Sequence, residues 1–203
     1  MKKIALFILG TVISLASFGQ TAQNSTIVYN KKNISGTTIV VSGYSLDVVN
    51  QALRSRLEIG GLRKPSSSKG FTIYQSQPFV DFGTLNYTIY TQVLFSKKTN
   101  NITINLMVDK GNENFADLNN DPELVQKMLD FLTNFATTYL SEYDLNLKIK
   151  AQTAEVEKLN KEYNSLFSEV EKLKKELSAK ESSLSAKGTA LNKAKETLNA
   201  LKK

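Results

Sequence analysis

Apolar residues recur every seven positions through the last third of the chain. When Val156 is set at heptad position a, every a position from Ile149 to Leu198 is apolar, and most d positions are apolar up to Leu173. A 3.5-residue period sustained over several heptads predicts a left-handed coiled coil. The predicted seam consists of Ile149, Val156, Leu159, Tyr163, Leu166, Val170, Leu173, Leu177, Leu184, Leu191, Leu198 and Leu201.

The length of this pattern indicates that the seam needs another helix. About 53 residues rising ~1.5 Å each extend about 80 Å, whereas a domain of roughly 120 residues offers about 25–30 Å. We therefore expect self-association through the C-terminal helix. The alternative is a hairpin that folds back near 182–183 or 187–189, although the register crosses both places without a skip. Gly188 costs only about 1 kcal/mol relative to alanine inside a helix, so it does not force a break.

The first half of the chain alternates strand and helix patterns. Residues 37–41 are β-branched and predict a strand, with a shorter strand before it at 26–29. Ser45 is placed to cap a helix whose apolar residues recur at helical spacing until Gly60. Residues 62–69 contain a proline and three consecutive serines, so they predict a loop.

An antiparallel meander is expected next. Residues 71–77 predict a strand that ends at Pro78. Strict alternation over 85–95, a lysine-rich turn at 97–101 and renewed alternation over 102–108 predict a hairpin. One face of this sheet is apolar and needs a cover.

A second helix supplies the cover. Asp121 is expected to cap it, Pro122 takes the first helical position, and a wide apolar stripe follows. The stripe changes phase near 138–145, as expected for one helix, from about 122 to 200, that leaves the sheet and pairs elsewhere. The expected fold class is therefore α+β: an antiparallel sheet with one face covered by helices, continuing into a long C-terminal coiled-coil helix.

The N-terminus has the pattern of a secretory signal peptide. Two lysines precede a mostly apolar run at 4–18, and small residues at Ser17 and Gly19 suit cleavage before Gln20. The run is about 15 residues, shorter than the roughly 20 of a membrane-spanning helix, and a retained anchor is the alternative. We expect an exported protein, periplasmic or extracellular in a bacterium, with no transmembrane segment after signal removal. The expected divisions are a signal peptide (1–19), a small α+β domain (20–145) and a coiled-coil helix (146–203).

The composition excludes several kinds of chemistry. The chain has no cysteine and no histidine, which removes disulfides, thiolate nucleophiles, Ser-His-Asp hydrolysis and most haem and zinc sites. Three serines at 66–68 lie near Lys64 and Lys69, as in a Ser-Lys hydrolase, but this is ordinary loop composition. We expect a protein that is not an enzyme and needs no cofactor.

Charge is concentrated in the tail. Residues 20–145 carry 11 basic and 11 acidic residues, whereas 146–203 carry 13 lysines and 8 glutamates. These lysines either solvate the outer face of a coiled coil or, together with Lys202 and Lys203, attract an acidic envelope surface. A neutral domain outside the cytoplasm is not expected to bind nucleic acid.

Two further clusters are candidate sites. The acidic loop at 109–123 offers side-chain oxygens at every second residue, as calcium loops do, but Pro122 replaces the turn glycine and Met128 the last ligand. Helix capping and a solvated loop are the expected roles, and no metal is expected. Three tyrosines of the strands either form a binding patch or pack on the sheet, and packing is expected. They are Tyr74, Tyr87 and Tyr90.

The expected elements follow the order β-α-β-β-β-α. The helix that follows a strand has the sequence GYSLDVVNQALRSRL, and the hairpin before the long closing helix has the sequence LNYTIYTQVLFSKKTNNITINLMV. Over residues 26–143 this order resembles a group of secreted bacterial domains of unknown function with a TATA-binding-protein-like fold. The resemblance implies a fold and no activity, because function depends on the site that a fold carries.

The expected function is that of a non-enzymatic secreted or cell-envelope protein, in which a coiled coil oligomerises or displays an α+β module. The alternative is a periplasmic domain that binds a ligand or ion through its sheet or acidic loop, with the helix as an oligomerisation handle.

Overall fold

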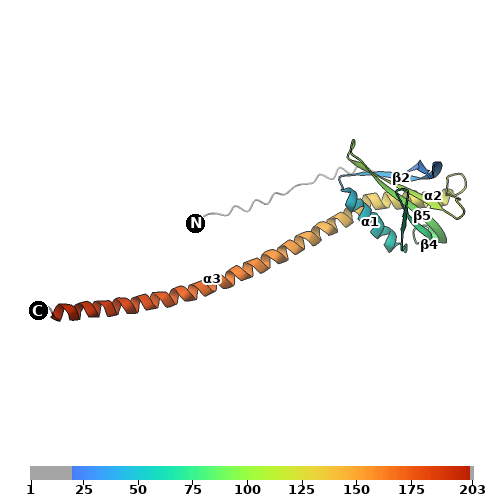
Figure 1. Cartoon of the computed structure of the whole chain (residues 1–203). Helices are drawn as coiled ribbons and strands as arrows, with labels where there is room; N and C mark the ends of the chain where they lie inside the picture. Colours follow the sequence, from blue (N-terminus) through green and yellow to red (C-terminus); the bar gives the residue numbers. More distant parts are fainter. Residues whose placement is uncertain (1–19, 202–203) are drawn as a thin grey trace. The chain divides into compact units, whose positions relative to one another are not determined.

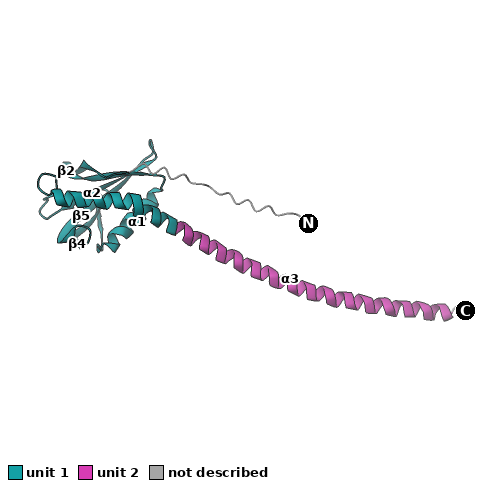
Figure 2. Ribbon diagram, turned by 180° about the vertical axis from the view of Figure 1, so that it is seen from behind, with its two compact units in different colours: residues 1–146 teal, residues 147–203 magenta. Residues whose placement is uncertain are grey.

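The computed structural model describes residues 20–201. The predicted signal peptide and the terminal Lys202 and Lys203 lie outside the described residues. The chain divides into two compact units, residues 1–146 and 147–203 (Figure 2).

The first unit contains an antiparallel sheet and the helices that pack on it (Figure 1). The six strands lie in the order β1-β2-β6-β5-β4-β3. The α+β prediction is thus confirmed. The elements are β1 (Gln23–Tyr29), β2 (Lys32–Ser42), α1 (Leu46–Ile59), β3 (Ser66–Ser68), β4 (Phe71–Phe79), β5 (Gly83–Ser96), β6 (Asn101–Asp109), α2 (Pro122–Asn134), the π-helix η1 (Phe135–Tyr139) and α3 (Leu140–Leu201).

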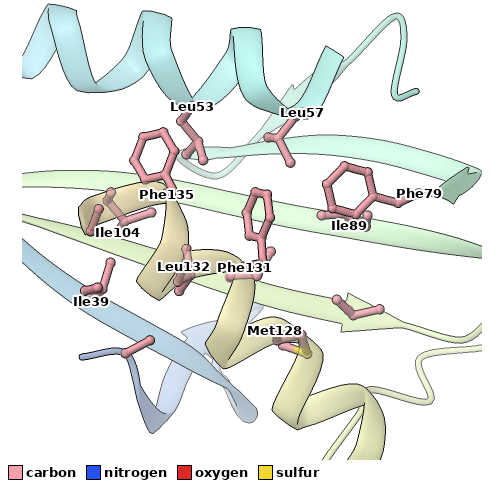
Figure 3. Close-up of a cluster of buried hydrophobic side chains, with 14 of the residues drawn as sticks. Ile39, Leu53, Leu57, Phe79, Ile89, Ile104, Met128, Phe131, Leu132 and Phe135 are labelled. Atoms are coloured by element: carbon pink, nitrogen blue, oxygen red, sulfur yellow. The ribbon is translucent and has the colours of Figure 1, made fainter. Parts of the chain in front are cut away.

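The main core lies between one face of the sheet and the helices α1 and α2 (Figure 3). Alternate residues of neighbouring strands supply the sheet side, because period-two alternation directs them to one face. Helical spacing directs Leu53 and Leu57 of α1 toward the same layer as Phe131 of α2. Burial of these side chains stabilises the unit by about 1.5–3 kcal/mol each.

Local signals fix the ends of α1. The side chain of Ser45 accepts a hydrogen bond from the backbone N–H of Val48 at 3.2 Å, which confirms the predicted cap. The helix stops before Gly60, where a Cβ would lie 2.0 Å from the ring of Phe79. Only glycine lets this buried ring pack against the helix end.

The opposite face of the sheet carries a second, smaller core that the sequence analysis did not predict. The ring of Tyr29 in β1 lies 5.3 Å from that of Phe71 in β4 and 5.2 Å from that of Tyr90 in β5. Three strands separate β1 from β4, so a flat sheet would place them about 19 Å apart. The sheet therefore coils until one corner lies over its own face. Gly36 permits the bend, because a Cβ there would lie 2.6 Å from Ile27 Cδ1.

Two strand predictions were wrong near the outer edge of the sheet. Residues 66–68, predicted as loop, form β3 because their backbone pairs with β4. The strand β4 runs past Pro78, which is tolerated because Ser76 forms a bulge and this part of β4 has no neighbouring strand on its outer side. There the side chain of Gln77 accepts from the N–H of Arg63 at 2.7 Å and donates to its C=O at 2.8 Å. Gln77 thus attaches the preceding loop to the open edge.

Candidate functional site

The C-terminal helical segment is continuous over 80 residues, from Pro122 to Leu201. At its start, Asp121 occupies the N-cap position but makes no capping hydrogen bond through its side chain. The carboxylate instead accepts from Lys110 Nζ at 2.6 and 2.7 Å. Asp121 thus occupies the predicted N-cap position, but its carboxylate bonds Lys110 rather than the N–H groups of the helix.

A π-helical turn divides this segment. In η1 each hydrogen bond spans one residue more than in an α-helix, so the faces after it are rotated relative to those before it. The rings of Phe135, Tyr139 and Tyr143 stack in sequence, with centroids 6.1 and 6.2 Å apart. The buried stripe ends at Leu140, and Leu145 is already exposed. The π-turn provides the rotation that the apolar pattern predicts a few residues later.

Every residue of the predicted seam lies on α3 and is exposed, with 47 to 81% of its surface accessible. Between residues 147 and 201, where every position is described, no side chain is buried. The apolar stripe of α3 therefore has no partner within the described chain. This is unusual, because an amphipathic helix normally buries its apolar stripe. No helix of residues 20–201 is long and apolar enough to cross a membrane.

Phe167 extends the seam and was missed by the sequence analysis. It lies at an e position beside Leu166, and 56% of its surface is exposed. Its ring stacks on that of Tyr163 at 6.4 Å. The signal was available, since residues four apart share a helix face.

The hairpin alternative is not adopted. The helix α3 passes through Gly188 without a break, and nothing lies within 4 Å of a Cβ built there. Ion pairs along it are exposed, as between Glu171 and Lys174 at 2.8 Å. Such pairs contribute only about 0.2–0.5 kcal/mol each.

The acidic loop uses its carboxylates within the chain. Asp117 accepts hydrogen bonds from the backbone N–H groups of Asn119 and Asn120 and from the Asn120 amide. These bonds, led by the Asn120 side chain, lower the pKa of Asp117. Within the described residues, no group of three or more acidic side chains is arranged to hold a metal ion.

The three tyrosines are separated by the sheet. Tyr74 and Tyr87 belong to the main core, whereas Tyr90 joins the smaller core on the other face. The Tyr74 hydroxyl is buried without a hydrogen-bond partner among the described residues. Burial and then the Glu58 carboxylate raise its pKa. Tyr74 lines a half-open hollow of about 340 Å³ beside Arg54, which is the feature nearest to the ligand-binding alternative.

Comparison of the chain with known proteins identified no relative. No family model, curated protein or solved structure matches the chain. The resemblance to secreted domains with a TATA-binding-protein-like fold therefore stays a prediction. The seam of α3 is a row of twelve exposed apolar side chains that no other part of the described chain covers. It is the candidate functional site.

Proposed function

We propose that this chain is a non-enzymatic secreted or cell-envelope protein, in which self-association of the C-terminal helix oligomerises or displays the α+β unit. The observation that carries this proposal is the exposure of all twelve seam residues on one continuous helix. The N-terminal export pattern supports a location outside the cytoplasm.

The energetics favour association. Fully burying a leucine or valine side chain yields about 1.5–3 kcal/mol, whereas association loses an estimated 4–15 kcal/mol of translational and rotational freedom. Half-burying twelve such side chains per chain offsets that loss. A single helix of this length in water is otherwise stabilised only by its backbone and by weak surface pairs.

Sedimentation of the mature protein, residues 20–203, tests the proposal. Leu166→Lys with Leu173→Lys places two charges in the seam and should dissociate the assembly. The matched control places two lysines at outward f positions, Ser168→Lys with Ser182→Lys, and should leave it assembled. Near-UV circular dichroism should show the α+β unit folded in both variants. A mature protein that is monomeric at about 100 μM, where even a Kd near that value gives dimer, would overturn the proposal.

The lysine excess of the helix supports a second contact, with an acidic envelope surface. Its lysines outnumber its glutamates and lie exposed along α3. Co-pelleting with anionic vesicles should occur at low salt and disappear at high salt, because exposed charges are screened. Pelleting that is unchanged by salt, or absent at low salt, would contradict this contact.

A further inference from the structure

We infer that the partner is the same segment of a second copy, aligned parallel and in register over Val156 to Leu177. This inference rests on the proposed self-association and specifies its geometry. Two independent properties of the exposed surface carry it: the order of apolar layers along the seam and the charges on the two sides of the seam.

The first property is the order of the layers. In a parallel pair each a or d residue meets its own copy, so Val156 to Leu177 gives seven consecutive apolar layers. In an antiparallel pair a meets d, and end-to-end overlap of the seam from Ile149 to Leu201 sets Lys180 against Val170 and Lys187 against Tyr163. The parallel pair instead places these lysines beyond the apolar layers, where their stems can reach solvent.

The second property is the charge beside the seam. Four consecutive g positions between Thr153 and Leu177 are glutamates, all exposed. An antiparallel pair centred on the apolar layers brings g against g, so glutamate faces glutamate four times, and like charges at these positions destabilise the pair. The four glutamates are Glu155, Glu162, Glu169 and Glu176.

A parallel pair brings each g residue against the e residue five positions later in its partner. Glu169 then faces Lys174, an attractive pair that occurs twice in a dimer. Glu162 lies beside Phe167, whose exposed ring adds apolar area next to the layers. Of the four glutamates only Glu176 meets a like charge, at Glu181. The charges therefore disfavour the antiparallel arrangement more strongly than the parallel one.

Because the chain has no cysteine, a disulfide between two copies can form only at a cysteine that is introduced. Each such variant therefore shows directly whether that position lies next to its own copy. Gln152→Cys and Lys180→Cys each place a thiol at a d position, one just before and one just after the apolar layers from Val156 to Leu177. A disulfide requires Cα atoms within about 7 Å, and only parallel, in-register chains bring both positions to their own copies. Each variant of the mature protein should form a disulfide-linked dimer under mild oxidation, reversed by reductant. The control Ser168→Cys, at an outward f position, should link at least several-fold more slowly.

The outcomes separate the two proposals. Antiparallel pairing over the apolar layers would instead link Gln152→Cys with Leu177→Cys in a mixture of the two variants. Variants that sediment as assemblies but do not link to themselves would overturn the parallel alignment and leave self-association standing. Variants that sediment as monomers, like the parent protein, would overturn self-association itself.

Discussion

The hydroxyl of Tyr139 lies 3.0 Å from the hydroxyl of Ser55, so the π-helical turn is joined to α1 across 84 residues of sequence. Tyr139 also stacks between Phe135 and Tyr143. This π-helical turn, a rare feature of helices, is thereby held from the side. The rotation that it introduces is fixed by packing rather than left to the helix.

This contact should contribute measurably to stability. Tyr139→Phe removes only the hydroxyl, and a partly buried hydrogen bond is worth about 0.5–1.5 kcal/mol. Urea unfolding of the mature protein should show that loss. The double variant with Ser55→Ala should lose less than the sum of the two single variants, because both remove the same bond. Additive losses would show that the hydroxyls do not interact.

The bend at Gly36 should tolerate no side chain. Gly36→Ala places a methyl group 2.6 Å from both Ile27 Cδ1 and the Leu106 carbonyl oxygen. Overpacking of this kind costs about 1–3 kcal/mol. The midpoint of urea unfolding should fall, and the Tyr29 ring should lose its fixed contacts in NMR spectra. An unchanged midpoint would mean that β1 can move away without loss.

Gly188 should respond in the opposite direction. A methyl group there meets nothing within 4 Å, and glycine inside a helix costs about 1 kcal/mol relative to alanine. Gly188→Ala should therefore slow amide exchange between residues 184 and 192, with little change in the α+β unit. Slower exchange in both units would indicate coupling between them, and no change would mean that this stretch is not helical in solution.

The distal seam should be improved by apolar residues at two d positions. Lys180→Leu with Lys187→Leu extends the apolar layers and should strengthen association at least tenfold, as measured by sedimentation. The control makes the same substitutions at outward positions, Lys161→Leu with Lys175→Leu, and should have a much smaller effect. Equal effects would mean that hydrophobicity alone, rather than the seam, drives assembly.

Asp117 should titrate below the ordinary range of an aspartate. Its folded-state pKa is lowered, so its stabilising effect is complete above the unfolded pKa and is lost as the pH falls through the folded value. Carboxyl NMR titration should show Asn120→Ala raising the pKa of Asp117. Asn119→Ala retains the backbone N–H that donates a hydrogen bond to Asp117, so it should leave the pKa of Asp117 unchanged. A pKa that does not move in Asn120→Ala would contradict the assignment of the cause.

The sequence predicted what depends on local periodicity and missed what depends on distant contacts. The cap at Ser45, the end of α1 at Gly60 and the continuous C-terminal helix follow from local signals. The second core was missed because it needs β1 to meet β4 through coiling of the whole sheet. The ion pair of Asp121 was not predicted for a similar reason, since Lys110 lies outside the short window of sequence from which a helix cap is recognised.

The candidate site was predictable in its residues but not in its full width. Heptad spacing located the twelve seam residues, all of them exposed, because it depends only on the chain itself. Phe167 was missed because only the a and d positions were counted, although its spacing of four residues from Tyr163 places both rings on one helix face.

The attachment of Gln77 to Arg63 gains importance when many copies are crowded together. A sheet edge with free N–H and C=O groups can recruit strands from a neighbouring molecule, which leads to aggregation. Along the second half of β4 that recruitment is obstructed by a side chain that bonds both backbone groups of Arg63, by the bulge at Ser76 and by Pro78, which has no N–H. This part of the sheet edge is therefore a poor template for a strand from a neighbouring copy held close by.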